Sequence, residues 1–187
     1  SIRAGAKPVC LGDGAISNWD FFDSIPELAR APRCLDFMHA CEHLEDAAKA
    51  IFKSDKTGKD KWFERYRRIL KRDRRSTDKA IRSMRHHLSK IPKRQKKRRH
   101  EITKVLRYFT KNLDKMKYRS LRDRGLPTGS GIVESACKTV VQARLKQSGM
   151  RWSFKGGQAI MNLRTGVLSD DRWDIAWSIH IRKNARV

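Results

Sequence analysis

The sequence predicts a helix-rich α/β chain in which two short parallel strands precede a long, basic, all-helical segment. Two apolar runs, each containing an aspartate, are separated by a helical pattern, and this strand, helix, strand order is typical of a parallel unit. Residues 53–124 then combine helical spacing of apolar residues with 29 Lys or Arg against 8 Asp or Glu. Residues 125–187 open with a glycine-rich turn and continue with helical patterns.

The first apolar run, residues 8–15, predicts a buried strand that carries Asp13 to its carboxyl end, because the run closes in Asp-Gly. A helical pattern follows over residues 19–28, and a second strand that contains Asp36 is predicted over residues 33–38. Ligand-binding groups in open α/β sheets lie outside the carboxyl ends of the strands. Asp13 is therefore a candidate ligand-binding group.

A helix is predicted over residues 39–52, where apolar residues recur at helical spacing. Its start matches the H-x-x-E-H pattern of inverted zinc peptidases, with His39 and His43 as metal ligands and Glu42 as the group that activates water. Five residues form a weak signal, and a peptidase has no use for so basic a chain. The peptidase interpretation is the less favoured one.

The four cysteines form no CxxC pair, so the sequence predicts reduced and mostly buried thiols. A zinc site is the alternative, since Cys34, His39, Cys41 and His43 lie within ten positions. The gaps between these residues do not match a zinc finger, and they would place the ligands on a strand, a turn and a helix. Buried thiols are therefore favoured.

The charge of the chain predicts a polyanionic partner. Lys and Arg total 44 against 20 Asp and Glu, which gives a formal net charge of +24. Such a surplus favours DNA or RNA and, less strongly, an anionic membrane. No apolar run approaches the roughly 20 residues of a membrane span, and no secretory leader pattern opens the sequence. We expect no membrane partner and a cytoplasmic, nucleoid-associated location.

The densest group of cations follows Pro92. A solvated helix face is the ordinary explanation of such a run, but six cations in seven positions with no acid repel one another unless phosphates neutralise them. We therefore favour a face that binds a nucleic-acid backbone without reading its sequence. The candidate residues are Lys93, Arg94, Lys96, Lys97, Arg98 and Arg99.

Glu134 follows the glycine-rich turn and falls in the first turn of a predicted helix that Ser130 would cap. An acid in this place interacts favourably with the helix dipole, which is the purely structural explanation. The alternative is that the carboxylate holds a divalent metal against a nucleic-acid backbone, since such metals bind hard oxygen ligands. From this motif alone both explanations stay open.

Further cations follow Glu134. The helix that contains it packs one apolar side and places Lys138, Arg144 and Lys146 on its wetter flanks. Arg151 and Trp152 lie in a loop, where the indole ring either stacks on a base or anchors the loop to the core. A further helix is expected to open at residues 156–160, and a last one over residues 172–177.

Several motifs occur in a fixed order between about Val9 and Trp177. They are residues 11–15 with Asn18-Trp19, and residues 35–44, 125–138, 144–152 and 156–160. Together these motifs resemble bacterial insertion-sequence transposases of the ISKra type. These enzymes are similar to Mutator-like DDE transposases, whose catalytic core is an RNase H-like α/β fold interrupted by a helical insertion. The resemblance therefore implies the C-terminal part of an RNase H-like fold with an all-helical insertion.

The resemblance also implies roles for single residues. Asp13 would be the second acid of the DDE set and Glu134 the third, while Asp36 and His39 match the Asp-x-x-His motif between them. The acids would hold Mg²⁺ or Mn²⁺, two ions in the complete enzyme, which activate water or a DNA 3′-hydroxyl and stabilise the leaving oxygen. The implied partners are transposon-end and target DNA and further copies of the chain in a homo-oligomer on DNA.

One departure from the family pattern concerns the first catalytic Asp. In the family it lies well upstream of the Asp-Gly-Ala motif, whereas residues 1–12 contain no acid. We therefore expect the C-terminal half of a transposase. It would consist of a partial RNase H-like core over residues 1–52, a basic helical insertion over residues 53–124, and helices that complete the core over residues 125–187. The function expected is DNA strand cleavage and transfer, and the alternative is a catalytically silent nucleic-acid-binding protein derived from a transposase.

Overall fold

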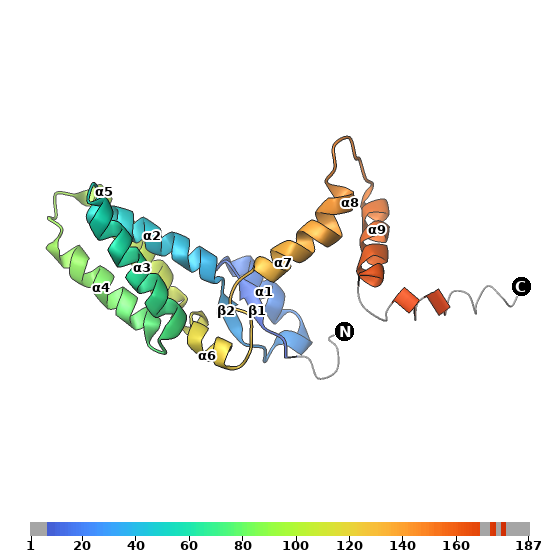
Figure 1. The fold of residues 1–187 in the computed structure, drawn as a ribbon, viewed down its shortest axis with the longest axis horizontal. Helices are drawn as coiled ribbons and strands as arrows, with labels where there is room; N and C mark the ends of the chain where they lie inside the picture. Colours follow the sequence, from blue (N-terminus) through green and yellow to red (C-terminus); the bar gives the residue numbers. More distant parts are fainter. Residues whose placement is uncertain (1–6, 169–172, 175–176, 179–187) are drawn as a thin grey trace, which may run out of the picture. The chain divides into compact units, whose positions relative to one another are not determined.

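The computed structural model of the chain describes residues 7–168, 173–174 and 177–178 (Figure 1). It divides the chain into two compact units, residues 1–130 and 131–187. The first unit contains a two-stranded sheet and a group of long helices, and the second contains helices only over its described residues.

The two strands are parallel, as the strand, helix, strand order predicts. Strand β1 (Cys10–Gly12) pairs with β2 (Arg33–Leu35), and Gly12 lies opposite Leu35. The crossover between them contains helix α1 (Ile16–Asp23) and the 3₁₀ turn η1 (Pro26–Leu28). Because the strands are parallel and in this register, the residues that follow them, Asp13 and Asp36, lie at the same edge of the sheet.

The second strand is shorter than predicted. Helix α2 (Phe37–Phe52) begins directly after it, so the expected strand over residues 33–38 and the expected helix start at His39 are both wrong by a few residues. The cause is Asp36, whose side chain accepts hydrogen bonds from the backbone N–H groups of Met38 and His39 and caps the helix.

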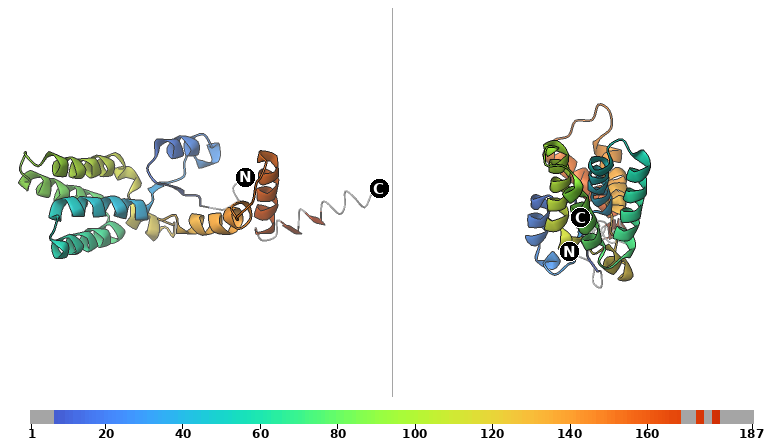
Figure 2. Two further views of the ribbon diagram at one scale, coloured as in Figure 1. Left: turned by 90° about the horizontal axis from the view of Figure 1, so that it is seen from above. Right: turned by 90° about the vertical axis from the view of Figure 1, so that its left-hand side faces the viewer.

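Four long antiparallel helices account for most of the first unit's core. Helices α2, α3 (Lys56–Arg72), α4 (Ser76–Lys90) and α5 (Lys96–Lys111) run lengthwise beside one another (Figure 2). Their apolar sides meet in one cluster that also includes Cys34 and Leu35 of the sheet. The segments predicted as core and as insertion therefore share a single hydrophobic core.

The chain then returns to the sheet. The 3₁₀ turn η2 (Leu113–Lys115) and helix α6 (Tyr118–Asp123) follow α5, and Tyr118 is fully buried against Phe37. Beyond α6, Thr128 accepts a hydrogen bond from the backbone N–H of Phe37, at 3.0 Å. The glycine-rich segment is thereby fixed beside the end of β2.

The second unit begins with a helical run made of α7 (Gly131–Ala136), the π-helical segment η3 (Cys137–Gln142) and α8 (Ala143–Leu145). Helix α9 (Phe154–Val167) follows, capped by Ser153, so the predicted helix at residues 156–160 is confirmed and starts earlier. Arg164 of α9 donates to the carbonyl oxygens of Thr139 and Val140. These bonds satisfy carbonyl groups of the π-helical segment and join it to α9.

The helix predicted over residues 172–177 lies partly outside the described residues. Positions 173, 174 and 177 are helical, whereas 172, 175 and 176 are not among those described. Over the part of the chain that the structure covers, no helix is both long and apolar enough to span a bilayer.

Candidate functional site

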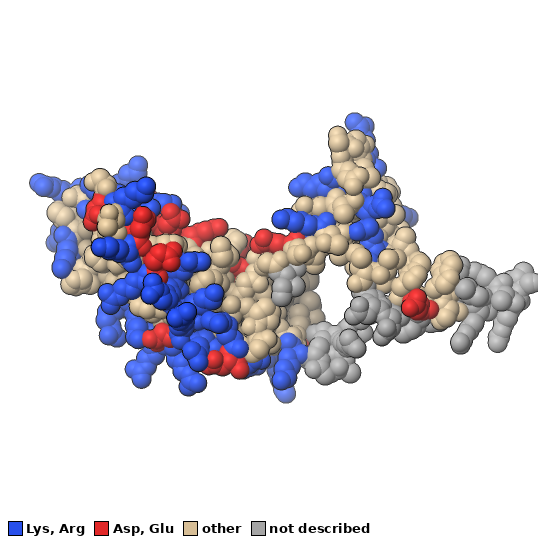
Figure 3. Space-filling model, in the orientation of Figure 1, with Lys and Arg blue, Asp and Glu red and all other residues tan. Residues whose placement is uncertain are grey.

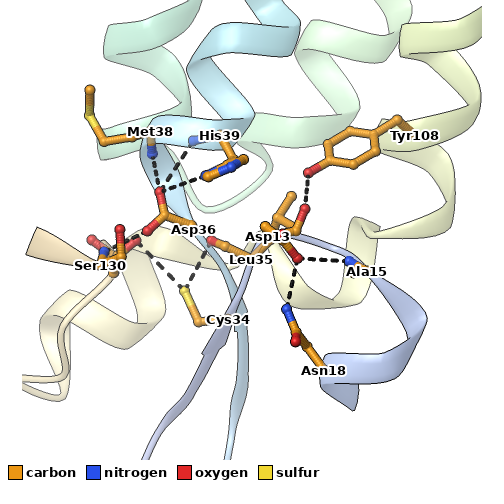
Figure 4. A network of polar contacts seen from close by, with 11 residues as sticks. Asp13, Ala15, Asn18, Cys34, Leu35, Asp36, Met38, His39, Tyr108 and Ser130 are labelled. Carbon is orange, nitrogen blue, oxygen red and sulfur yellow. Dashed lines mark hydrogen bonds and ion pairs between the residues drawn. The ribbon is translucent and has the colours of Figure 1, made fainter. Parts of the chain in front are cut away.

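Asp13 is an exposed carboxylate held in one orientation. It directly follows β1, and its Oδ1 accepts hydrogen bonds from the backbone N–H of Ala15 and from Nδ2 of Asn18, both at 2.9 Å (Figure 4). Among the described residues no group donates to Oδ2. One oxygen atom therefore fixes the carboxylate and the other is available to a ligand.

The turn that bears Asp13 is also held from the helical segment. The hydroxyl group of Tyr108, on α5, donates to the backbone oxygen of Asp13 at 2.8 Å. Gly14 has a φ of +94°, and a Cβ atom there would lie 3.1 Å from both Leu35 Cδ1 and Tyr108 Cε2. Only glycine satisfies this backbone conformation and this close approach together.

The pKa of Tyr108 is affected by negative charge near this edge of the sheet. Its pKa is raised to about 12, first by burial and then by the nearby charges of Asp13, Asp36 and Glu42. The tyrosine therefore stays a neutral hydrogen-bond donor at physiological pH. The same three carboxylates make this edge an acidic spot in a basic chain.

Asp36 has a different environment from Asp13. It is 2% exposed, and its two oxygens accept from the backbone N–H groups of Met38, His39 and Ser130. Burial alone would raise the pKa of Asp36, but the hydrogen bonds from Ser130, His39 and Met38 outweigh burial and hold it below its usual value. Asp36 is thus an ionised structural group whose oxygens are already engaged.

The two histidines of the H-x-x-E-H match have separate surroundings. His39 lies beside Asp36, with 3.8 Å between His39 Nδ1 and Asp36 Oδ1, and about half of its side chain is exposed. The ring of His43 packs on Tyr108 with 3.8 Å between centroids, and burial lowers its pKa. His43 therefore acts as a packing residue between α2 and α5.

Buried thiols, predicted for most of the cysteines, are confirmed: Cys10, Cys34 and Cys41 are buried and unpaired, and Cys137 is exposed. Burial, with a smaller contribution from Asp36, raises the pKa of Cys34 to about 12, and burial raises that of Cys41 to about 11. A zinc site needs thiolates, which these environments strongly disfavour. Among the described residues no group of three or more His, Cys, Asp or Glu side chains is arranged to hold a metal.

Glu134 lies in the first turn of α7, where the sequence predicts it, and it is exposed. It belongs to the second unit, whereas Asp13, Asp36 and His39 belong to the first. The structure thus brings Asp13, Asp36 and His39 to one edge of the sheet. The shared metal site of Asp13 and Glu134 stays a prediction.

The six cations after Pro92 fall into two groups. Lys93, Arg94, Lys96 and Lys97 are exposed, whereas Arg98 and Arg99 are partly buried. The Lys and Arg side chains spread over the helical region of the first unit, with acids between them (Figure 3).

Arg98 and Arg99 close the ends of two neighbouring helices. Arg98 donates from Nε to the carbonyl oxygen of Ala50 at 2.6 Å and from Nη2 to that of Ile51, in the last turn of α2. Arg99 donates from Nη1 to the carbonyl oxygens of Leu88 and Ile91, at the end of α4. A cation at a helix C-terminus satisfies free carbonyl groups and interacts favourably with the dipole.

In the second unit the predicted DNA-binding cations are all exposed. Lys138 lies in the π-helical segment, Arg144 in α8, Lys146 just beyond it, and Arg151 in the loop before α9. Trp152, in the same loop, is 43% exposed. This exposure leaves part of the indole ring available for stacking.

Three contacts of the site were not predicted from the sequence. Asn18 orients Asp13, Tyr108 fixes the turn from 95 positions away, and Ser130 binds Asp36 from 94 positions away. The contact of Asn18 is the local one of the three, since Asn18 lies in the first turn of α1, five positions after Asp13.

Comparison of the chain with protein-family models, with curated proteins and with solved structures finds no match in any of the three.

Proposed function

We propose that this chain is part of the catalytic domain of a DNA transposase of the DDE type, with Asp13 and Glu134 as metal ligands. The observation that carries the proposal is the state of Asp13, which is an exposed carboxylate held through one oxygen at the carboxyl end of a parallel strand. Pre-orientation of a ligand lowers the cost of binding a metal. The family resemblance and the basic helices support the same function.

The donor set fits Mg²⁺ or Mn²⁺. Both ions prefer carboxylate oxygens, and Asp13 Oδ2 accepts no hydrogen bond from the described residues. Such ions would supply an activated water or 3′-hydroxyl and stabilisation of the leaving oxygen. The chain's own residues orient the ligand: Asn18 and Ala15 hold the carboxylate, and Tyr108 holds its backbone.

Asp36 has another role in this proposal. Its oxygens are engaged by three backbone N–H groups, so using it as a ligand would require breaking buried hydrogen bonds. It shapes the start of α2 and the segment before α7. A further acid, supplied from outside residues 1–187 or by another copy of the chain, would complete the DDE set.

Binding of Mn²⁺ to the isolated chain, measured by isothermal titration calorimetry, tests this function. Asp13→Asn and Glu134→Gln should each weaken binding, because each removes a ligand charge. Asp20→Asn is the matched control, since Asp20 is an exposed acid on the neighbouring α1. Equal affinity in the wild type, Asp13→Asn and Asp20→Asn would refute the metal role of Asp13.

The second candidate function is nucleic-acid binding without catalysis, favoured by the exposed cations of the helical segment. Its expected result differs from that of the transposase. Affinity for duplex DNA would be high and independent of Mn²⁺, and Mn²⁺ would bind to neither the wild type nor the variants.

Homo-oligomerisation on DNA, measured by sedimentation with and without a duplex, is expected under the transposase proposal.

A further inference from the structure

A column of basic residues follows one side of α5. The four members within the helix recur at intervals of three and four positions, which places them on the same helix face, and Lys93 lies in the turn just before it. Together with Arg99 and Thr103 they line a depression of about 410 Å³ to which no acidic residue contributes. We call this column the α5 stripe, and it consists of Lys93, Lys96, His100, Lys104 and Arg107.

The charges of the α5 stripe are not neutralised within the described part of the chain. Lys96, Lys104 and Arg107 are exposed and form no ion pair with any described carboxylate. Some cations elsewhere in the helical region are paired, as Lys79 is with Asp73 and Arg67 with Glu64, and others, such as Arg68, form no ion pair with a described residue. Like charges one helical turn apart destabilise a helix, so a bound polyanion would relieve this repulsion.

The direction of the α5 stripe is informative. Arg107 is followed by Tyr108, whose hydroxyl group donates to the backbone oxygen of Asp13. The stripe ends in the part of α5 that contacts the turn bearing Asp13, where Asp13, Asp36 and Glu42 place negative charge around Tyr108. The cations lie on α5, whereas the acids lie in the turn after β1 and at the start of α2.

The length of the α5 stripe matches a nucleic-acid backbone. From Lys96 to Arg107 a helix rises about 16 Å. DNA presents one phosphate per 3.4 Å of axis on each strand, but a strand winds half a turn round the duplex in about five base pairs, so about three successive phosphates of one strand face the stripe. A backbone lying on the stripe would meet cations first and then an acidic edge at which only a bound metal would relieve the repulsion of its phosphates.

We propose that the α5 stripe binds the backbone of duplex DNA and leads one strand to the edge of the sheet that bears Asp13. Only the destination of the strand rests on the proposed transposase function. The binding of the backbone rests on charge complementarity, on the depression and on the helical spacing. Lys104 and Arg107 are then expected to contact phosphates, although neither belongs to the dense run after Pro92.

A charge-matched pair of triple variants tests the path. The stripe variant carries Lys96→Gln, Lys104→Gln and Arg107→Gln. The control carries Arg68→Gln, Arg82→Gln and Arg85→Gln, exposed residues of α3 and α4 for which no hydrogen bond or ion pair is described. Both lose three positive charges, so any general field effect is the same. Circular dichroism and urea unfolding establish that both are folded.

Fluorescence anisotropy with a labelled DNA duplex at several salt concentrations gives the result. Three lost phosphate contacts should flatten the slope of log K against log salt by about 2.7 in the stripe variant, and the control should change it far less. Equal slopes in the two variants would overturn the proposal. Tighter binding of an RNA duplex of the same sequence, with the same dependence on the stripe, would overturn DNA as the occupant.

The same variants separate this inference from the transposase proposal. Asp13→Asn should leave the salt slope unchanged, and the stripe variant should bind Mn²⁺ as the wild type does. If Asp13→Asn binds Mn²⁺ as tightly as the wild type while the salt slopes of the stripe variant and the control still differ, only the metal site is refuted. A normal Mn²⁺ site with equal slopes would refute the α5 stripe alone.

Discussion

The carboxylate of Asp36 accepts a hydrogen bond from the backbone N–H of Ser130, with 2.5 Å between Oδ2 and nitrogen and 94 positions between the residues. Phe37 reinforces the contact by donating to Thr128. A single side chain thus caps α2 and fixes the segment that leads to α7. The position of Ser130, which directly precedes α7, therefore depends on Asp36.

Asp36→Ala should lower the free energy of unfolding by about 3 kcal/mol. The substitution removes a helix cap and leaves buried backbone N–H groups without an acceptor. Urea denaturation measures the change. Asp20→Ala is the control and should change the stability by less than about 0.5 kcal/mol, because the Asp20 side chain is on the surface. A tolerated Asp36→Ala would contradict the role of the carboxylate.

The contribution of Asp36 should also depend on pH. The pKa of Asp36 is lowered in the folded protein, so the unfolded state binds the proton more tightly. The stabilisation is therefore complete above the unfolded pKa, about 3.9, and is lost as the pH falls through the lower folded pKa. The stability difference between the wild type and Asp36→Asn should shrink below about pH 4, and a difference that stays constant down to pH 2 would argue against an ionised Asp36.

Arg98→Gln and Arg99→Gln should each destabilise the protein by about 1 to 3 kcal/mol, because each leaves carbonyl groups at a helix end without a charged donor. Lys96→Gln and Lys97→Gln should change the stability by less than about 0.5 kcal/mol, since both side chains are exposed. Urea unfolding of the four variants gives the comparison. Four equal values would show that the run is a uniform surface.

Gly14→Ala should cost about 2 kcal/mol. The new Cβ atom would combine a backbone φ of +94° with contacts of 3.1 Å to Leu35 and Tyr108. Thermal or urea unfolding measures the loss, and weaker Mn²⁺ binding should accompany it because the turn bears Asp13. Gly129→Ala is the control, as no atom lies within 4 Å of the added Cβ atom there.

Tyr108→Phe should lower the stability by about 1 kcal/mol, because it removes the hydrogen bond to the backbone of Asp13 and keeps the ring that packs on His43. It should also weaken Mn²⁺ binding relative to Tyr66→Phe, a matched change on α3. Calorimetry and urea unfolding measure the two effects. Identical behaviour of the two variants would show that the Tyr108 hydroxyl group does not hold the turn.

The parallel pair of strands was predictable because its signal is local. Each strand is a short apolar run next to an aspartate, and the helical pattern between them required a crossover. The end of β2 was not predicted, because the apolar residues Phe37 and Met38 continue the run while Asp36 begins a helix. An aspartate before a helical pattern is itself a capping signal, and it would have corrected this boundary.

The candidate site was predictable only in part, for the same reason. Asp13 is visible because it follows a strand, and Glu134 because it opens a helix. Tyr108 and Ser130 reach the site from 95 and 94 positions away, and no periodicity within either segment encodes such a contact. The structural use of Arg98 and Arg99 was equally hidden, since charge alone does not distinguish a cap from a free cation.

The helix-capping arginines also change what the composition of the chain means. The formal charge of +24 counts Arg98 and Arg99 exactly as it counts Lys96 and Lys97. The guanidinium groups are committed to carbonyl oxygens of their own fold, so a ligand meets fewer cations than the sequence contains. Arginine-to-lysine exchange should thus be tolerated at Arg94 and costly at Arg98, since an ammonium group cannot reach two carbonyl groups with the same fixed fork.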